Sequence, residues 1–299
     1  MKNVQTSSGQ RGVSLIELMV GLAIGLLVIT VAMSALMVSR GISGSVSDSS
    51  SIQQQGAYVL RVIGQQLRQN GSLFLNPDPT GGASTDVLSA VAFEVRADAR
   101  SGGNSFEQHN TLVGGADTVT TGFRRYRDNV FLADNAANAD NTRTPPTLSV
   151  TGTDFQARNC VGGPGNAKTD ERVESIFTFA NGNLLCGGNG TAAQPIAQNV
   201  AQFQVTYLTQ TTDVTGVKLQ YKNGSDMPAF AADPAWRQVQ GVQVCLVLFG
   251  SELIDMPTGS NYIDCNGDSV NVTTLNGQRQ NRMHLLFRNT FQLRSQGLL

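Results

Sequence analysis

The chain has 299 residues, of which 40% are hydrophobic and 14% are charged, and its formal net charge is -1. This length is enough for one substantial core in addition to a membrane segment. A near-neutral chain lacks the basic face of a nucleic-acid-binding protein, so the composition argues against that class.

The first recognisable element is an apolar run over residues 15–38 that contains a single charged residue, Glu17. About 20 apolar residues suffice for a helix to cross the hydrocarbon core of a bilayer. A polar leader, residues 1–12, carries Lys2 and Arg11, which predicts that the N-terminus stays inside and the remainder crosses. A carboxylate in such a helix costs about 2.5–3.5 kcal/mol at the bilayer centre, so Glu17 is a candidate functional residue.

Two simpler interpretations of this run are a cleavable signal peptide and a plain membrane anchor. A signal peptide has an apolar core of about 7–15 residues, followed by a cleavage site made of small residues. Here the core is longer, and the nearest small-residue pair, Ala32 and Ser34, lies inside it. A plain anchor explains neither Glu17 nor the glycine at the junction between the leader and the apolar run.

That junction resembles the class III signal of type IV prepilins and of type II secretion pseudopilins. The resemblance rests on Gly12 followed by Val13-Ser14-Leu15-Ile16-Glu17-Leu18-Met19-Val20. In that family a membrane-embedded prepilin peptidase cleaves after the glycine and N-methylates the new first residue. The resemblance implies cleavage between Gly12 and Val13, methylation of Val13, and an assembly role for Glu17. The sequence departs slightly from the family, because Val13 and Ser14 stand where phenylalanine and threonine are commonest.

The spacing of this signal has a chemical rationale. Cleavage before Val13 creates an α-amino group whose unperturbed pKa of about 8 keeps it cationic at neutral pH. Glu17 lies four residues, or one helical turn, further along the chain. Among packed apolar helices neither charge is tolerated alone, so we expect Glu17 of one subunit to pair with the amine of its neighbour. Such a pair would fix the axial register of the assembly.

One long helix is expected from residue 13 to about residue 70, roughly 85 Å at 1.5 Å per residue. Residues 39–51 are rich in serine and glycine, so we expect the helix to be weakened and locally melted there. An amphipathic period resumes over residues 52–69, and Asn70-Gly71 ends the helix.

Within the apolar half, Gly21 and Gly25 have the spacing of a close helix–helix contact, although glycine is also common in membrane helices generally. These features divide the chain into four expected parts: a leader (1–12), a transmembrane and assembly half of the helix (13–38), an exit segment with the amphipathic half (39–70), and a periplasmic β-rich head (71–299).

The head is expected to be an antiparallel sheet with long polar loops. Phe203, Val205 and Tyr207 alternate with polar residues, which is typical of a strand with one exposed face. We expect strands at 87–95, 118–126, 147–156, 172–179, 200–209, 217–221, 239–249 and 283–293. Loops are expected at 187–193 and 258–281, among others. The fold class is therefore α+β, and the resemblance implies a type IV pilin-like fold in which the long helix packs on the sheet.

Three segments of the head resemble PilW-type minor pilins. They begin at Asn199 (Asn-Val-Ala-Gln-Phe-Gln-Val-Thr-Tyr), at Trp236 (Trp-Arg-Gln-Val-Gln-Gly-Val-Gln-Val) and at Phe287 (Phe-Arg-Asn-Thr-Phe-Gln-Leu-Arg). The resemblance implies a low-abundance subunit that primes type IVa pilus assembly and sits at or near the tip. The implied partners are other minor pilins, the major pilin, the prepilin peptidase and the inner-membrane assembly platform.

The implied location is the inner membrane, as a single-pass protein with a periplasmic head, and then the extracellular pilus tip. A J-type minor pseudopilin of type II secretion is the alternative within the superfamily. A membrane-tethered periplasmic enzyme or binding protein is the alternative from another class.

Four cysteines, Cys160, Cys186, Cys245 and Cys265, are expected to form disulfides, because the head lies in an oxidising compartment. Three pairings are possible, and the sequence does not select one. The local scheme, Cys160 with Cys186 and Cys245 with Cys265, would contribute about 3 kcal/mol per bridge in the chain-entropy model. Metal ligation is the alternative, but no C-x-x-C pattern or neighbouring histidine supports zinc.

Other binding chemistry has little support. Asp264, Asn266 and Asp268 alternate like the start of a calcium loop, but Leu275 stands where the twelfth-position glutamate belongs, so a polar turn is the simpler interpretation. The segment 162–169 differs from a phosphate-binding loop at Ala167, and His109 and His284 belong to no metalloprotease motif. We therefore expect an assembly subunit rather than an enzyme, with no cofactor.

Overall fold

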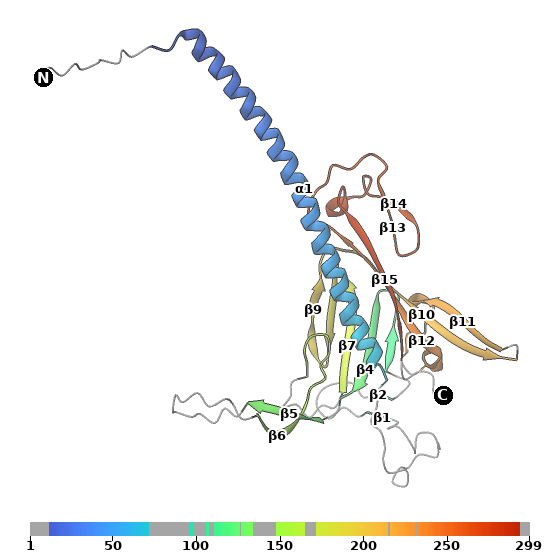
Figure 1. Ribbon diagram of the computed structural model, residues 1–299. Helices are drawn as coiled ribbons and strands as arrows, with labels where there is room; N and C mark the ends of the chain where they lie inside the picture. The colour runs from blue at the N-terminus through green and yellow to red at the C-terminus, as the bar shows by residue number, and fades with distance from the viewer. Residues whose placement is uncertain are drawn as a thin grey trace, which may run out of the picture. The chain divides into compact units, whose positions relative to one another are not determined.

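The structure is a computed structural model of the chain (Figure 1). It describes residues 12–71, 96–97, 106–107, 111–125, 127–133, 148–164, 172–214, 216–230 and 233–293. The chain forms two compact units, Met1–Ser50 and Ser51–Leu299. The expected strand at 87–95 and His109 lie outside the described residues. The next described segment after Gly71 is the short strand β1, Arg96–Ala97.

The long helix α1 spans Leu15–Gln69 and contributes to both units. It continues through residues 39–51, so the expectation of local melting there is wrong. Serine costs only a few tenths of a kcal/mol in a helix, and Ser45 donates its hydroxyl to the Gly41 carbonyl (3.1 Å). The helix ends as expected, because Gly71 takes a positive φ of 72° and donates its N–H to the Gly122 carbonyl (2.9 Å).

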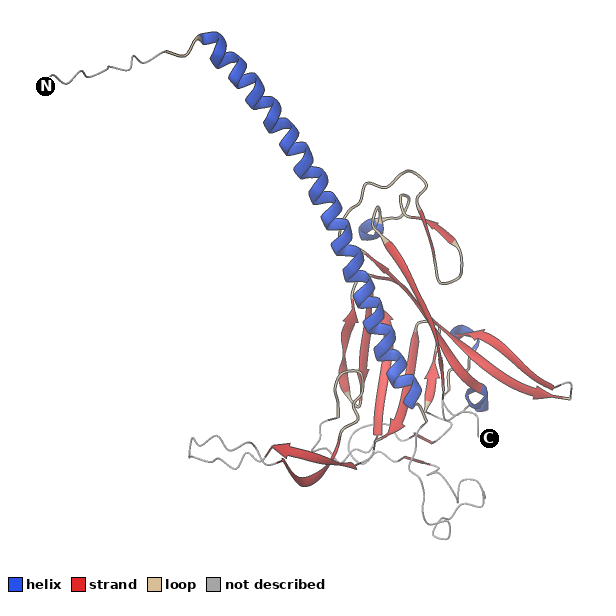
Figure 2. Cartoon of the chain, in the orientation of Figure 1, coloured by secondary structure: helices blue, strands red, loops and turns tan. Residues whose placement is uncertain are grey.

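The strands described in the rest of the head pair antiparallel, and with the long helix they make the fold α+β (Figure 2). One sheet has five strands in the order β3-β4-β7-β8-β9, with bounds Leu112–Gly114, Thr118–Arg124, Arg172–Ala180, Asn183–Gly188 and Thr191–Ala197. The other has four strands in the order β11-β10-β12-β15, with bounds Gly216–Asn223, Val200–Asp213, Val239–Phe249 and His284–Gln292.

Three two-stranded ribbons complete the described strands: β1 with β2 (Arg96–Ala97, Phe106–Glu107), β5 with β6 (Arg127–Ala133, Leu148–Phe155), and β13 with β14 (Asn261–Ile263, Ser269–Asn271). The described residues also form the short 3-10 helices η2 (Gly224–Asp226), η3 (Pro234–Gln238) and η4 (Gly277–Arg279).

Two expected loops are partly strands. Residues 187–193 comprise the end of β8, a tight turn at Asn189 and Gly190 with positive φ, and the start of β9, and residues 258–281 contain β13 and β14. In both cases glycine and asparagine residues make turns between paired strands rather than an extended loop.

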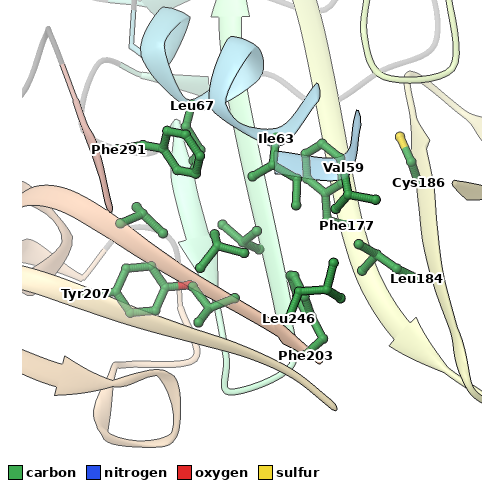
Figure 3. Close-up of a cluster of buried hydrophobic side chains, with 14 of the residues drawn as sticks. Val59, Ile63, Leu67, Phe177, Leu184, Cys186, Phe203, Tyr207, Leu246 and Phe291 are labelled. Carbon is green, nitrogen blue, oxygen red and sulfur yellow. The ribbon is translucent and has the colours of Figure 1, made fainter. Parts of the chain in front are cut away.

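The core of the head lies between the C-terminal part of α1 and the two sheets. Val59, Ile63 and Leu67 present the buried face of the helix, spaced by four residues as an amphipathic helix requires. They join one hydrophobic cluster with residues of both sheets, including Phe177, Leu184, Phe203, Tyr207, Leu246 and Phe291 (Figure 3).

Two glycines of α1 let β15 approach closely. A Cβ on Gly56 would lie 2.6 Å from the Phe287 ring, and a Cβ on Gly64 would overlap the Phe291 ring. The aromatic rings of β15 therefore fill the space that a side chain at either glycine would take.

Two buried polar side chains add directional contacts between α1 and the first sheet. Gln66 accepts a hydrogen bond from the Ser175 hydroxyl (3.0 Å) and donates to the Arg158 carbonyl (3.1 Å). Asn70 accepts from the Thr121 hydroxyl (2.7 Å). Because buried polar groups are costly when unpaired, these bonds fix the rotation and height of the helix on the sheet.

Candidate assembly site on the N-terminal helix

The candidate site lies at the start of α1, where the sequence places the processing and assembly residues. Gly12, Val13 and Ser14 precede the helix, and Glu17 lies in its first turn. The backbone N–H of Glu17 donates to the Ser14 hydroxyl (3.2 Å), and the N–H of Leu18 donates to the Ser14 carbonyl (3.1 Å). Ser14 is therefore the N-cap, and Ser14 with Glu17 has the S-x-x-E spacing of a capping box.

The helix termini have electrostatic consequences at this site. The unpaired N–H groups of the first turn give the start of α1 a partial positive charge, which favours a carboxylate there. Glu17 is thus compatible with the helix itself, but this contribution is only about 0.3–1 kcal/mol. It is smaller than the cost of placing a lone carboxylate in a hydrocarbon environment.

The segment that follows is apolar on every side. Leu15–Met37 is the one helical segment, within the described part of the chain, that is long and apolar enough to cross a membrane. Large hydrophobic side chains around its whole circumference are exposed, among them Ile16, Leu18, Met19, Val20, Ile24 and Val28. A helix that is hydrophobic all round needs lipid or other apolar helices around it.

Polar groups within this segment are satisfied inside the helix. Thr30 donates its hydroxyl to the Leu26 carbonyl (2.6 Å), and Ser34 donates to the Val31 carbonyl (2.9 Å). These bonds remove two unpaired donors from the apolar surface. Glu17 is therefore the one side chain of Leu15–Met37 whose charge requires a partner from outside the helix.

The expected packing residues Gly21 and Gly25 lie on the same stretch. A Cβ at either position would meet no atom within 4 Å. Their small size leaves the helix backbone accessible along one strip, which suits a neighbouring helix.

The structure pairs the four cysteines locally. Cys160 is bonded to Cys186, and Cys245 to Cys265, with Cα–Cα distances of 6.2 and 5.8 Å. The second bridge fastens the β13–β14 segment to the outer face of β12, where Arg288 also donates to the Cys265 carbonyl (2.7 Å). The two disulfides stabilise the head, and all four cysteines lie far from the start of α1 in the sequence.

The three residues singled out for calcium form a turn in which several of their oxygen atoms are used. One Asp264 carboxylate oxygen accepts the backbone N–H groups of Asn266 and Asp268 (2.8 and 2.9 Å). The Asn266 side-chain oxygen accepts from the Gln204 amide (3.0 Å). The geometry is that of the polar turn, and among the described residues no group of three or more His, Cys, Asp or Glu side chains has metal-binding geometry.

One cluster in the head was not expected from the sequence. The His284 ring lies stacked between Tyr262 (centroids 4.4 Å apart) and Phe249 (5.8 Å), and its Nδ1 lies 2.9 Å from the Arg282 carbonyl. Burial lowers the pKa of His284, and the nearby charge of Arg279 acts in the same direction, against the opposing hydrogen bond to Arg282. The aromatic partners lie 22 and 35 positions away, so no local motif reveals this cluster.

Comparison with known families bears on both ends of the chain. Residues 170–295 match the family described as type IV pilus-assembly protein W, and residues 7–33 match the prokaryotic N-terminal methylation motif. A solved type IV-like pilin from Thermus thermophilus is similar at a TM-score of 0.36 and 11% identity, over 82% of this chain and 96% of that one. The sequence has no significant match among proteins of curated function.

The two family matches include the residues of the candidate site and the C-terminal part of the head. The first spans β7 to β15, and the second contains Gly12, Val13 and Glu17. The apolar segment and the methylation motif indicate that the N-terminal part of α1 is a membrane anchor. The C-terminal part of the head is therefore similar to type IV pilus-assembly protein W, and the start of the chain is similar to the prokaryotic N-terminal methylation motif.

Proposed function

We propose that this subunit is inserted in the inner membrane with its head in the periplasm, is processed between Gly12 and Val13, and then enters a minor-pilin complex that primes pilus assembly. In the finished filament it sits at or near the tip. The observation that supports this most directly is the apolar segment Leu15–Met37, whose one carboxylate, Glu17, lies one turn from the expected new terminus.

The proposed assembly step exchanges lipid for neighbouring helices around Leu15–Met37. In lipid Glu17 stays near the membrane surface, because it lies in the first turn of the helix. In a filament core it is surrounded by apolar side chains, and the cationic amine of an adjacent Val13 supplies the opposite charge. Neither charge is left unpaired in the correct register, whereas a shift by one turn leaves both uncompensated.

Processing preserves the start of the helix. Cleavage after Gly12 removes only residues before the N-cap, so the bond from the Glu17 N–H to the Ser14 hydroxyl remains. Methylation of the Val13 amine keeps its positive charge. The mature terminus then consists of two residues ahead of α1, which places the amine close to the first turn of its own helix and accessible to a neighbour's Glu17.

The head supplies contacts with other pilins rather than catalysis. Its folding is secured by two disulfides and by the glycine–phenylalanine contacts between α1 and β15. We propose a structural role for the whole chain, with the other minor pilins, the major pilin, the prepilin peptidase and the assembly platform as successive partners.

Substitution in the leader tests this proposal. A strain that lacks the gene should lose surface pili, and the wild-type gene should restore them. Gly12→Val should yield an unprocessed, slightly heavier protein that stays in the membrane and does not restore pili. Gly9→Val, in the same leader, is the matched control and should be processed and functional.

Three results would contradict the proposal. They are restoration of pili by Gly12→Val, normal piliation without the gene, and a defect confined to protein secretion. The last result would favour the J-type pseudopilin of type II secretion.

A further inference from the structure

The β10–β11 hairpin extends beyond the sheet that supports it. Thr209 is the last residue of β10 paired with β12, whereas β10 and β11 stay paired as far as Asp213 and Gly216. The distal half of the hairpin therefore has no strand beside β10, and Figure 1 shows it reaching past β12. A two-stranded ribbon without a third strand is only marginally stable in water. The projecting half of the hairpin would therefore be stabilised by pairing with a strand of a partner.

One face of β11 is apolar and exposed. Val217, Leu219 and Tyr221 alternate along the strand and are 64%, 59% and 53% exposed. Alternation places all three side chains on the same face of the sheet. The cross-strand neighbours on β10 are Thr212, Gln210 and Leu208, so the apolar stripe runs along the outer strand itself.

The backbone edge of β11 is also open. β11 is the last strand of its sheet, and no described strand pairs with its outer edge. β9, an edge strand of the five-stranded sheet, differs from β11 because it contains Pro195, which has no N–H to donate to another strand. On β15, the opposite edge of the same sheet, Phe287 and Phe291 pack against α1. Alternating N–H and C=O groups along an open edge are matched by an extended peptide strand.

The charge on β11 identifies the kind of strand that fits. Lys218 and Lys222 lie on the face opposite the apolar stripe, and the sequence of β11 contains no acidic residue. A second copy paired antiparallel about Leu219 would align the apolar stripes but gather four lysines on one face without a counter-charge. A strand with acidic side chains opposite Lys218 and Lys222 avoids that repulsion, so charge disfavours self-pairing and favours a different subunit.

We propose that β11 is a docking edge for an extended strand in the head of another pilin subunit. That strand carries apolar residues on one face, against Val217, Leu219 and Tyr221, and acidic residues on the other, against Lys218 and Lys222. The class of partner rests on the proposed function. The open edge of β11, its apolar stripe and its two lysines define the docking surface, and these observations do not depend on the proposed function.

Site-specific photocrosslinking in the native cells tests this proposal with the full chain. Tyr221 replaced by p-benzoylphenylalanine keeps an aromatic ring on an exposed position, and Leu253 (72% exposed), replaced in the same way, is the control. The Tyr221 position should give an adduct with another pilin subunit, identified by mass spectrometry, and the Leu253 position should not. No adduct, an adduct with a second copy of this chain, or an adduct with a protein that is not a pilin would overturn the proposal.

Charge reversal tests the chemistry of the partner. Lys218→Glu combined with Lys222→Glu should reduce the Tyr221 adduct by about tenfold, because rim charges set the complementarity of an interface. Lys218→Arg with Lys222→Arg should preserve it. An adduct that is unchanged after charge reversal would refute the acidic partner strand. Intact disulfides on a non-reducing gel establish that each variant is folded.

The same cells distinguish failure of the inference from failure of the proposed function. If Val13 is the mature terminus and the chain enters filaments, but Tyr221 gives no pilin adduct, the docking edge alone is wrong. If the leader remains and no pili depend on the chain, the proposed function is wrong, whatever the adduct.

Discussion

The backbone N–H of Glu17 donates a hydrogen bond to the hydroxyl of Ser14, with 3.2 Å between the two heavy atoms. This bond makes Ser14 the N-cap of α1 and places Glu17 at the third helical position, where a carboxylate also favours the helix. Glu17 therefore has two separable roles, one in starting its own helix and one in pairing with a neighbouring subunit.

Glu17→Gln separates these roles. Glutamine is compatible with the capping box but carries no charge, so it leaves the start of the helix intact and removes the ion pair. We expect Glu17→Gln and Glu17→Ala both to be processed and both to enter sheared filaments at about a tenth of the wild-type level or less, as expected when one partner of a buried pair is lost. The measurement is an immunoblot of the filament fraction against the membrane fraction. Near-normal incorporation of Glu17→Gln would assign Glu17 to capping alone.

Two adjacent glutamines of α1 test how the helix is fastened to the head. Gln66 is buried and bonds Ser175 and Arg158, whereas Gln65 is exposed. Gln66→Leu leaves the Arg158 carbonyl without that donor and should lower the free energy of unfolding by about 1–3 kcal/mol. Gln65→Leu should change it by less than about 0.5 kcal/mol. Urea unfolding followed by the fluorescence of the single tryptophan, Trp236, measures both, and equal effects would refute the account of Gln66.

Gly64 tests the close approach of β15 to the helix. Gly64→Ala gains about 1 kcal/mol of helix propensity but forces its methyl group against the buried ring of Phe291. Overpacking costs about 1–3 kcal/mol, so we expect net destabilisation in the same urea experiment.

Two controls separate this clash from a general effect of alanine in α1. Adding Phe291→Leu to Gly64→Ala should recover part of the loss by vacating space. Gly41→Ala, where a Cβ meets no atom within 4 Å, should not destabilise the head. A Gly64→Ala variant more stable than the wild type would show that the ring moves away at no cost.

His284 predicts how the stability of the head depends on pH. Burial between Tyr262 and Phe249 lowers its pKa in the folded state, so the unfolded chain binds the proton more tightly. The contribution of neutral His284 is present above its unfolded pKa of about 6.5 and is lost as pH falls through that value toward the lower folded pKa. The free energy of unfolding should therefore fall between about pH 8 and about pH 5.

His284→Phe provides the control for this pH effect. It keeps an aromatic ring in the stack but does not titrate, so the fall in stability over that pH range should become shallower. The variant loses the bond to the Arg282 carbonyl, so it should also be less stable at high pH. A pH dependence identical to that of the wild type would mean that other groups control it.

The sequence predicts best the elements whose signal is local. The apolar run, the amphipathic period and Asn70-Gly71 define α1 almost to the residue, because length and periodicity alone separate it from its surroundings. β12 matches its expected bounds, 239–249, since a mostly apolar strand that is largely buried at the centre of a sheet has clear ends.

The elements that were missed depend on partners far away in the chain. β8 and β9 contain many small and polar residues, and they are strands because β8 pairs with β7 and β9 pairs with β8. The melting expected at 39–51 follows from serine and glycine propensities, whose small costs the continuous helix overcomes. The Gln66 bonds and the His284 stack join residues that are distant in sequence, which a local pattern does not reveal.

The most direct measurement is the mass of the N-terminal peptide of the protein recovered from sheared filaments and from membranes. We expect the filament form to begin at Val13 with one added methyl group, which supplies the cationic partner that Glu17 requires. Filament protein that retains Met1–Gly12, or that begins inside the apolar run near Ser34, would leave Glu17 without that partner and would contradict the proposed assembly mechanism.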